Sequence, residues 1–426
     1  MSQRWAAHMK CRPVIEHIGG PGHAARRQAP QLLVTLRNHA HLAAVYGNAF
    51  AAAVERELQG RALAAGITSD AALRLGDDRF LLSPYPILTS ESVSRERLLE
   101  YVLISLCSTP VEHGGQTAFA LVEARLIDGV DTKLTDSGIG PGTATQPGFA
   151  PDQCTEAWRL EYAKDMSEAL RVFQLLNAGR LTLAFQPIVA RVDFSQQLYQ
   201  EGLVRALDED GEPVSLEAAL KSLERVGLIR LFDRCVVQAV LALLRLRPAL
   251  CLGCNISAQS VVVDSWWRQV LEDLEADPFV ASRLVIELTE NASFPGTDEP
   301  LEFVSKLQQL GCRIALDNFG SRFNTLDFSV RAKPAIIKID NGYLGRGRSD
   351  GAARSVLTNL VQLCSRLADD IVIEGIESEA DIDAVRRRMD VWLQGDFIGR
   401  AKVRRSEHGM APDLLMGCTA TASEQT

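Results

Sequence analysis

The amino-acid sequence predicts an α/β protein in which a (β/α)8-type barrel follows a smaller α/β domain. Between residues 181 and 393, eight short apolar runs alternate with longer amphipathic stretches, a pattern typical of strands separated by helices. A polar residue ends or follows seven of these runs, as expected for a barrel with a site at one end. A stretch rich in Gly, Pro, Thr and Asp at residues 128–153 separates this region from the part before it. On the pattern alone, a doubly wound open sheet remains the alternative.

Length and composition limit the classes of protein that need to be considered. The chain has 426 residues, which indicates two or three domains, and its 46% hydrophobic and 23% charged residues are ordinary for a globular protein. A net charge of −9 without a basic stripe argues against a duplex nucleic-acid binder. No apolar run is long enough to span a membrane, and no apolar stretch follows Lys10 and Arg12 as it would in a secretory signal.

The cysteines indicate a reducing, cytoplasmic environment. Their number, nine, is odd and they are scattered, which does not suit a disulfide framework. Cys251 and Cys254 form a CxxC at an apolar strand, but no second cysteine pair or nearby histidine completes a zinc site. We therefore expect this pair to have no metal or redox role.

The chain is expected to consist of five segments. They are a flexible lead-in (1–29), the smaller α/β domain (30–155), a linker helix (156–180), the barrel (181–405) and a flexible tail (406–426). Within the smaller domain the pattern predicts a strand at 32–36, an alanine-rich helix at 49–65, a turn at Gly76 and Asp77, and a strand at 118–127. A helix over 156–176 leads into the barrel.

The strands of the barrel are expected at the apolar runs, with helices between them. The predicted strands are 181–185, 197–201, 250–254, 283–286, 313–316, 335–339, 371–373 and 391–393. Pro300 and Gly311 bracket a helix in the usual order, and Pro248 ends the helix before the third strand.

The residues at the ends of these strands predict a functional site. In a barrel the carboxyl ends of the strands converge on one face, so these side chains should lie together. Carboxylate and amide oxygens suit Mg²⁺ or Mn²⁺, and several buried carboxylates without a cation would be costly. One polar residue at a strand end is usually a solvated loop start or a helix cap, but seven on consecutive strands indicate a site. The seven are Glu201, Asn255, Glu287, Asp317, Lys338, Glu374 and Gln394.

The motifs around these residues resemble, in the same order, those of the bacterial EAL domain family. They are FQPIV (185–189), EGLVR (201–205), NISAQS (255–260), ELTEN (287–291), DNFGS (317–321), KID (338–340), EGIES (374–378) and QGDFIGRA (394–401). The resemblance covers roughly residues 165–405. It implies a (β/α)8-like barrel that hydrolyses cyclic di-GMP to linear pGpG with two divalent metal ions.

The resemblance also implies a role for individual residues. The first metal ion would be held by Glu201, Asn255, Glu287 and Asp317. The catalytic residues would be Lys338 and Glu374 beside the attacking water, with Glu374 as general base, together with Glu201. The contacts to cyclic di-GMP would come from Gln186, Leu203, Arg205 and Gln394, with Arg205 facing a phosphate and Leu203 a base. The loop after the fifth strand would be anchored by Glu290.

Two departures from the family pattern bear on activity. Asn318 stands where the family has the second aspartate of DDFG, so it makes a weak second-metal position because a neutral amide binds Mg²⁺ less tightly than a carboxylate. Arg322 replaces a glycine in the loop that couples metal binding to dimerisation in the family. Binding of cyclic di-GMP is therefore a safer expectation than its turnover.

The first domain resembles the GGDEF domain of diguanylate cyclases over about residues 30–165. RLGDDRF (74–80) matches the RLGGDEF signature, and the stretch 32–48 aligns to the family's metal- and guanine-binding stretch without gaps. The functional positions have changed: the metal aspartates fall at Thr35 and Asp78, the guanine-binding pair at Ala43 and Ala44, and the catalytic glutamate at Arg79. Since a cyclase needs carboxylates to hold Mg²⁺ on GTP, we expect a regulatory or dimerising domain without cyclase activity. Nucleotide binding that tunes the barrel is the alternative.

Three functions remain open from the sequence. The first is a metal-dependent cyclic di-GMP phosphodiesterase, and the second is a non-catalytic cyclic di-GMP receptor that acts through a protein partner. The third is an interaction scaffold without a nucleotide. The resemblance implies a homodimer through the barrel. His39 and His41 are two residues apart, but a solvated strand exit is expected there rather than a metal site.

Overall fold

The computed structural model describes residues 30–68, 72–89, 94–127, 155–289, 298–320, 325–347, 351–385 and 390–403. The chain forms two compact units. The first consists of Met1–Gln174, Ala219–Leu228 and Asp264–Gln269, and the second of Leu175–Ala218, Ile229–Val263 and Val270–Thr426. The lead-in, the tail from residue 404, and the predicted loop anchor Glu290 lie outside the described residues, as does Arg322. The five predicted segments therefore stay a prediction.

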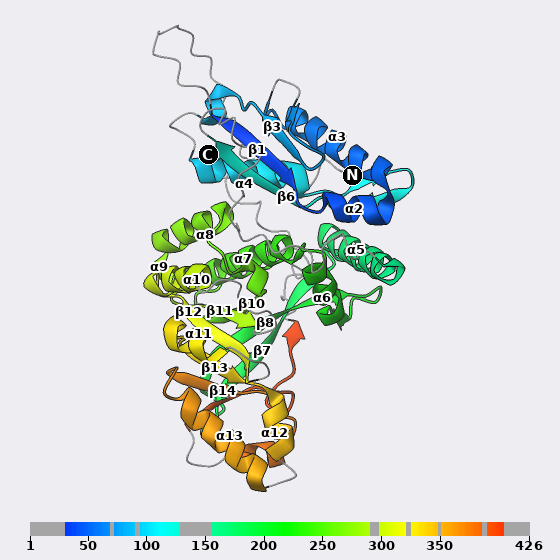
Figure 1. The fold of residues 1–426 in the computed structure, drawn as a ribbon. Helices are drawn as coiled ribbons and strands as arrows, with labels where there is room; N and C mark the ends of the chain where they lie inside the picture. Colours follow the sequence, from blue (N-terminus) through cyan, green and yellow to red (C-terminus); the bar gives the residue numbers. More distant parts are fainter. Residues whose placement is uncertain are drawn as a thin grey trace. The chain divides into compact units, whose positions relative to one another are not determined.

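The first unit contains a small antiparallel sheet with helices. Its elements are β1 (Gln31–Leu36), α2 (His39–Tyr46), α3 (Asn48–Ala64), β2 (Leu73–Arg74), β3 (Arg79–Leu82), a 3₁₀ turn (Pro86–Thr89), α4 (Arg95–Cys107), β4 (Val111–His113), β5 (Gln116–Ala118), β6 (Val122–Ile127) and α5 (Glu156–Asn177), blue to green in Figure 1. The strand order is β2-β3-β1-β6, and β4 pairs with β5 in a separate hairpin. The predicted turn at Gly76 and Asp77 is the loop of the β2–β3 hairpin.

The predicted strand at 118–127 is divided in the structure. It appears as β5 and β6, separated by residues 119–121. Asn38 explains the interruption: it is fully buried, its Nδ2 donates to the carbonyl of Phe119 at 3.0 Å, and its Oδ1 accepts from the N–H of Leu121 at 2.9 Å. The side chain thus supplies hydrogen bonds that a strand partner would otherwise make.

The expectation of a solvated strand exit at His39 and His41 is wrong. Both residues begin helix α2, and His41 is buried. Its ring lies 5.6 Å from that of Tyr162 and 5.5 Å from that of Trp158, between centroids. His41 therefore packs among aromatic rings rather than facing solvent.

The second unit contains the predicted barrel (Figure 1, green to red). Its strands are β7 (Leu181–Ala190), β8 (Gln197–Leu207), β9 (Pro213–Ser215), β10 (Leu252–Ile256), β11 (Leu284–Thr289), β12 (Arg313–Phe319), β13 (Ile336–Ile339), β14 (Asp370–Ile373), β15 (Trp392–Leu393) and β16 (Lys402–Val403). The helices between strands are α6 (Glu217–Arg225), α7 (Ile229–Leu246), α8 (Ser265–Ala276), α9 (Pro278–Ala281), α10 (Asp298–Gln309), α11 (Thr325–Ala332), α12 (Asn341–Gly347), α13 (Gly351–Cys364) and α14 (Glu379–Ala384), with a 3₁₀ turn at Ala258–Ser260.

The barrel is closed by β7, which pairs with both β8 and β15. This closure contradicts the open-sheet alternative. Strands β8 and β10 to β15 run parallel to one another, but β7 is antiparallel to β8, β15 and β16. A regular (β/α)8 repeat would place a helix between the first two strands. Here only residues 191–196 connect β7 to β8, and so short a connection permits only a hairpin.

Apolar side chains fill the barrel and the layer between its strands and helices. One cluster inside the barrel contains Ile188, Tyr199, Val285, Ala315, Ile336 and Val372. A second lies between β12–β15 and helices α12–α14, and includes Phe319, Leu344, Leu357 and Val361. Among the described helices, none has the length and apolar character needed to cross a membrane.

Candidate active site in the barrel

The polar residues predicted from the strand ends form one connected network inside the barrel. They come from β8, β10, β11, β12 and β13 and from the positions directly after β14 and β15, and Gln186 of β7 joins them. Several lie inside a strand rather than at its end. Glu201, expected to end its strand, has six further residues of β8 after it because the hairpin with β7 continues.

Lys338 lies at the centre of four carboxylates. Its Nζ is 2.7 Å from Oε2 of Glu287, 3.0 Å from Oε2 of Glu201 and from Oε1 of Glu374, and 3.2 Å from Oδ1 of Asp317. Its side chain is 1% exposed. These five residues are called the acid cluster below. With all five ionised the cluster carries a net charge of −3, which is unfavourable in a buried site unless protons or a cation neutralise it.

Two side-chain amides hold Glu201 on its other sides. Nδ2 of Asn255 donates to Oε1 at 2.5 Å, and Nε2 of Gln394 donates to Oε2 at 2.5 Å. Gln394 also donates to Oε1 of Gln186 at 3.2 Å, and Gln186 donates to the carbonyl of Gly399 at 3.1 Å. The hydrogen bonds from Glu201 through Gln394 and Gln186 to Gly399 are called the amide chain. The carboxylate of Glu201 is thereby held by three donors, Asn255, Gln394 and Lys338.

The charge environment shifts the pKa values of the cluster in different directions. Burial raises the pKa of Glu201, but Lys338 and the amide donors outweigh burial and lower it. Burial, with the charge of Glu201, raises the pKa of Glu287 well above its usual range. Burial also raises the pKa of Glu374 to about 8. For Lys338, burial lowers the pKa, but the surrounding carboxylates raise it well above its ordinary value, so this lysine stays charged.

Glu287 has the most constrained carboxylate of the cluster. Its side chain is fully buried, and Oε1 receives no hydrogen bond from the described residues. The carboxylate lies over Gly253, where an added Cβ would overlap Oε1 of Glu287 and would lie 2.5 Å from Cε2 of Tyr199. Tyr199 is also fully buried, with no hydrogen bond to its hydroxyl from the described residues. A buried acceptor without a donor is the kind of atom that a cation can satisfy.

Sequence reasoning missed Tyr199 and Gly253 as parts of the site. A glycine inside an apolar strand is the one signal that could have indicated them, because it often marks a close approach. Gly253 pairs with Glu201 on one side and with Val285 on the other, so it lies between two strands that carry the acid cluster.

Asn318 lies beside the cluster in an unusual backbone conformation. Its φ is +58°, in the left-handed region that asparagine and aspartate adopt more readily than other side chains. Its Nδ2 donates to Oδ2 of Asp317 at 2.5 Å, so the amide is already bound to one carboxylate of the cluster. The register between β12 and β13 shifts between Leu316 and Phe319, so the backbone around Asn318 departs from regular strand pairing.

Two of the four predicted nucleotide contacts, Leu203 and Arg205, lie on the same face of β8 as Glu201. Glu201, Leu203 and Arg205 alternate along the strand, so they share one face. Leu203 and Arg205 are half-buried, and Nη1 of Arg205 donates to the carbonyl of Val204 at 2.9 Å. This arrangement leaves an apolar and a cationic side chain in line with the acid cluster.

No group of three or more histidine, cysteine or acidic side chains within the described residues is arranged as a metal site. Lys338 instead bonds to the carboxylates expected to hold the first ion. At the CxxC, burial raises the pKa of both Cys251 and Cys254, which disfavours the reactive thiolate.

Comparison with known proteins agrees with this geometry. The EAL domain family model matches residues 167–401. Cyclic di-GMP phosphodiesterase PdeB of Shewanella oneidensis is 22% identical over 236 residues, covering 54% of this chain and 28% of PdeB. Cyclic di-GMP phosphodiesterase PdeF of Escherichia coli is 25% identical over 234 residues, covering 54% of this chain and 31% of PdeF. The chain thus spans less than a third of the length of either relative.

A solved structure extends the likeness of fold to most of the chain. Vibrio cholerae LapD S helix-GGDEF-EAL, in its apo form, has a TM-score of 0.50 at 16% identity, covering 87% of this chain and 89% of LapD in that structure. At this identity the likeness concerns the fold only. The family match covers more than half of the sequence and includes every strand that contributes to the acid cluster. The chain therefore belongs to the EAL domain family.

Proposed function

We propose that this chain is a metal-dependent phosphodiesterase that hydrolyses cyclic di-GMP to linear pGpG. The observation that carries the proposal is the acid cluster, in which the carboxylates of three strands and of Glu374, directly after β14, surround one buried lysine. Two relatives named cyclic di-GMP phosphodiesterase, each matching 54% of this chain, support it.

The residues fit a hard divalent cation, Mg²⁺ or Mn²⁺. The cluster has an excess of negative charge, and Oε1 of Glu287 is a buried acceptor without a hydrogen bond from the described residues. Carboxylate and amide oxygens are the ligands that such ions prefer. The residues that would hold the ion are Glu201, Asn255, Glu287 and Asp317, with Asn318 at a weak second position. When bound, such ions lower the pKa of water and stabilise charge on the phosphate oxygens.

The chain's own residues would position the substrate and move the proton. Arg205 is placed to pair with a phosphate, Leu203 to pack against a base, and Gln186 and Gln394 to contact the nucleotide from the amide chain. Glu374 would accept the proton of the attacking water, and its raised pKa suits a base that works near neutral pH. The ammonium of Lys338 would favour hydroxide over water beside it.

A cyclic di-GMP receptor without turnover is the second candidate. Asn318 favours this receptor, because its neutral amide stands where the family has an aspartate and already donates a hydrogen bond to Asp317. Binding would then need only the nucleotide contacts, and the signal would pass to a protein partner. A second copy of the chain, paired through the barrel, is part of either proposal.

We propose that the first unit is a GGDEF-like domain without cyclase activity. The fold likeness to LapD supports this assignment. Thr35 lies opposite Arg79 in the β1–β3 pairing, and the N–H of Leu36 donates to the carbonyl of Asp78 at 2.7 Å. The positions compared with the cyclase signature thus lie together, but Asp78 is the only acid among these four residues. Incubation with GTP and Mg²⁺ should yield no cyclic di-GMP.

Conversion of cyclic di-GMP to pGpG, measured with Mg²⁺ and separately with Mn²⁺, tests the proposed activity. We expect turnover by the wild type and at least a hundredfold loss in Glu201→Gln, which removes a charge that the site needs. Asn318→Asp should raise kcat roughly tenfold, equivalent to about 1.4 kcal/mol, because it adds a carboxylate at the second position. The backbone conformation suits either side chain.

Asn359→Asp is the matched control, since Asn359 is exposed on α13 and is not a member of the acid cluster. Turnover by Asn318→Asp alone, with nucleotide binding by the wild type, would select the receptor. Absence of both binding and turnover in all variants would leave the scaffold as the remaining function.

A further inference from the structure

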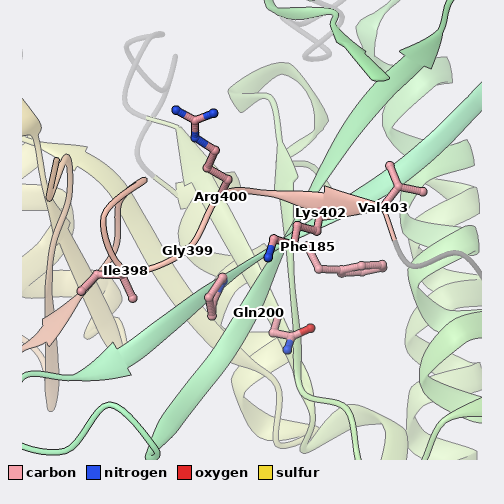
Figure 2. Close-up of a pocket in the computed structure, with 8 residues that line it drawn as sticks. Phe185, Gln200, Ile398, Gly399, Arg400, Lys402 and Val403 are labelled. Atoms are coloured by element: carbon pink, nitrogen blue, oxygen red, sulfur yellow. The ribbon is translucent and has the colours of Figure 1, made fainter. Parts of the chain in front are cut away.

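A groove on the wall of the barrel lies apart from the acid cluster. It has a volume of about 440 Å³ and is formed by β7, β8 and the segment that leads into β16 (Figure 2). Its lining includes Phe185, Pro187, Gln200, Ile398, Arg400 and Lys402.

The register of the strands separates this groove from the site. On β7 and β8, Gln186 pairs with Glu201, and both belong to the network inside the barrel. Pro187 pairs with Gln200 one residue further along, and successive side chains of a strand point to opposite faces. The groove therefore lies on the outer face of the two strands, and a molecule in it would not touch Glu201.

The lining of the groove combines apolar surface with positive charge. Phe185, Pro187 and Ile398 supply the apolar part, and Arg400 and Lys402 supply two cations. No described residue that lines the groove is acidic. Arg400 pairs with Asp396 at 3.3 Å, but their side chains are 79% and 60% exposed, so water competes strongly for this pair and its guanidinium can accept another anion.

The wall of the groove is held in place before any ligand binds. Gly399 packs so closely that an added Cβ would lie 2.9 Å from Cγ of Pro187. Its carbonyl accepts the last hydrogen bond of the amide chain, from Gln186 at 3.1 Å. Lys402 pairs with Phe185 across β16 and β7, so the two residues lie side by side on neighbouring strands. A preformed groove needs little ordering when a ligand binds.

We propose that this groove is a second binding site, which takes a small amphipathic anion. The ligand would have an apolar body against Phe185, Pro187 and Ile398, and a carboxylate, sulfonate or phosphate group facing Lys402 and Arg400. Its volume is within the range of small-molecule sites, which are mostly apolar with a few placed polar groups. The site is independent of the phosphodiesterase proposal, because it uses none of the residues assigned to catalysis.

A fluorescence titration of the full chain with 8-anilinonaphthalene-1-sulfonate, an aromatic anion, tests the proposal. We expect one site, with a Kd that rises at least fivefold in the double variant Arg400→Gln/Lys402→Gln. The double variant Arg159→Gln/Arg366→Gln removes the same charge at two other exposed positions and should keep the wild-type Kd. N-phenyl-1-naphthylamine, which has the same apolar body without the sulfonate, should bind at least fivefold more weakly to the wild type.

Three results would overturn the proposal. One is an equal Kd for the groove variant and the charge-matched control, when circular dichroism shows both to be folded. Another is equal binding of the charged and the neutral probe, which would indicate a merely apolar surface. The third is competitive displacement of the probe by cyclic di-GMP, which would place the probe in the nucleotide site. Failure of cyclic di-GMP to bind at all would concern the proposed function and leave this site unaffected.

Discussion

Lys338 neutralises part of the negative charge of the acid cluster. It is the one cation within salt-bridge distance of the four carboxylates in the described part of the chain, and its own side chain is 1% exposed. A buried carboxylate tolerates ionisation only with a partner, so the loss of this lysine affects four groups together. A divalent cation and this lysine would therefore make overlapping contributions to stability.

Lys338→Met tests this role. Without added metal, we expect the free energy of unfolding to fall by about 3–5 kcal/mol, because the variant leaves carboxylates buried and unpaired. Addition of Mn²⁺ should restore more stability to the variant than it adds to the wild type. Urea unfolding, followed by tryptophan fluorescence, measures both effects.

Lys306→Met is the control for this experiment. Lys306 pairs with Glu302 at 2.6 Å on α10, where both side chains are substantially exposed. Its loss should cost less than about 1 kcal/mol. Equal stability of Lys338→Met and the wild type in the absence of metal would show that Lys338 does not stabilise the buried carboxylates.

Tyr199 gives a second prediction at the residue scale. Its hydroxyl is buried and receives or donates no hydrogen bond among the described residues, so it contributes a desolvation cost. Tyr199→Phe keeps the ring over Gly253 and removes the hydroxyl. We expect the metal-free protein to gain roughly 1 kcal/mol of stability, as measured by urea unfolding. A loss of stability would show that the hydroxyl has a bound partner.

At the scale of the elements, β10 depends on the absence of a side chain at Gly253. Parallel strands β8 and β11 lie on either side of it, and the carboxylate of Glu287 and the ring of Tyr199 occupy the space above it. The strand therefore positions the site through a residue that carries no functional group. The apolar pattern of residues 250–254 does not show that this position must lack a side chain; the glycine itself is the only signal in the sequence.

Gly253→Ala should destabilise the protein and weaken binding of Mn²⁺. The added methyl group overlaps Glu287 and Tyr199, and such overpacking costs about 1–3 kcal/mol. Gly60→Ala is the control, because a Cβ at Gly60 meets no atom within 4 Å in the interior of α3. That substitution should instead stabilise the helix by roughly 0.5–1 kcal/mol. Equal effects of the two substitutions would mean that Gly253 has room for a side chain.

At the scale of the whole molecule, buried acids make stability depend on pH. Glu374 has a pKa of about 8 in the folded protein, against 4.5 as its ordinary value. Above pH 4.5 the unfolded chain loses a proton that the folded protein keeps until about pH 8. The contribution of Glu374 is therefore complete below pH 4.5 and is lost as the pH rises to 8.

We expect the metal-free wild type to lose stability between pH 5 and pH 8 relative to Glu374→Gln. The difference should change by at most about 1.4 kcal/mol per pH unit, the limit for one proton. Urea unfolding of both proteins at pH 5, 6.5 and 8 in a chelator measures it. Saturating Mn²⁺ should reduce the pH dependence, because a bound cation replaces the proton. A pH-independent difference would show that Glu374 titrates normally.

The sequence by itself determined the strands of the barrel and the polar residues that lie at or near their ends. All eight predicted strands are present, because each is a local apolar run whose length and spacing do not depend on distant residues. The polar residues at their ends, from Glu201 to Gln394, could be identified for the same reason. The structure connects them in one network, while their roles remain predictions.

Only the tertiary structure decided how these elements meet. The reversal of β7, the four carboxylates around Lys338, the approach of Glu287 to Gly253 and the groove beside β16 all involve residues that are far apart in the chain. Glu201 and Lys338, for example, are 137 positions apart. Strand direction and close side-chain contact result from closure of the barrel, and a local pattern of apolar and polar residues contains no information about distances of that kind.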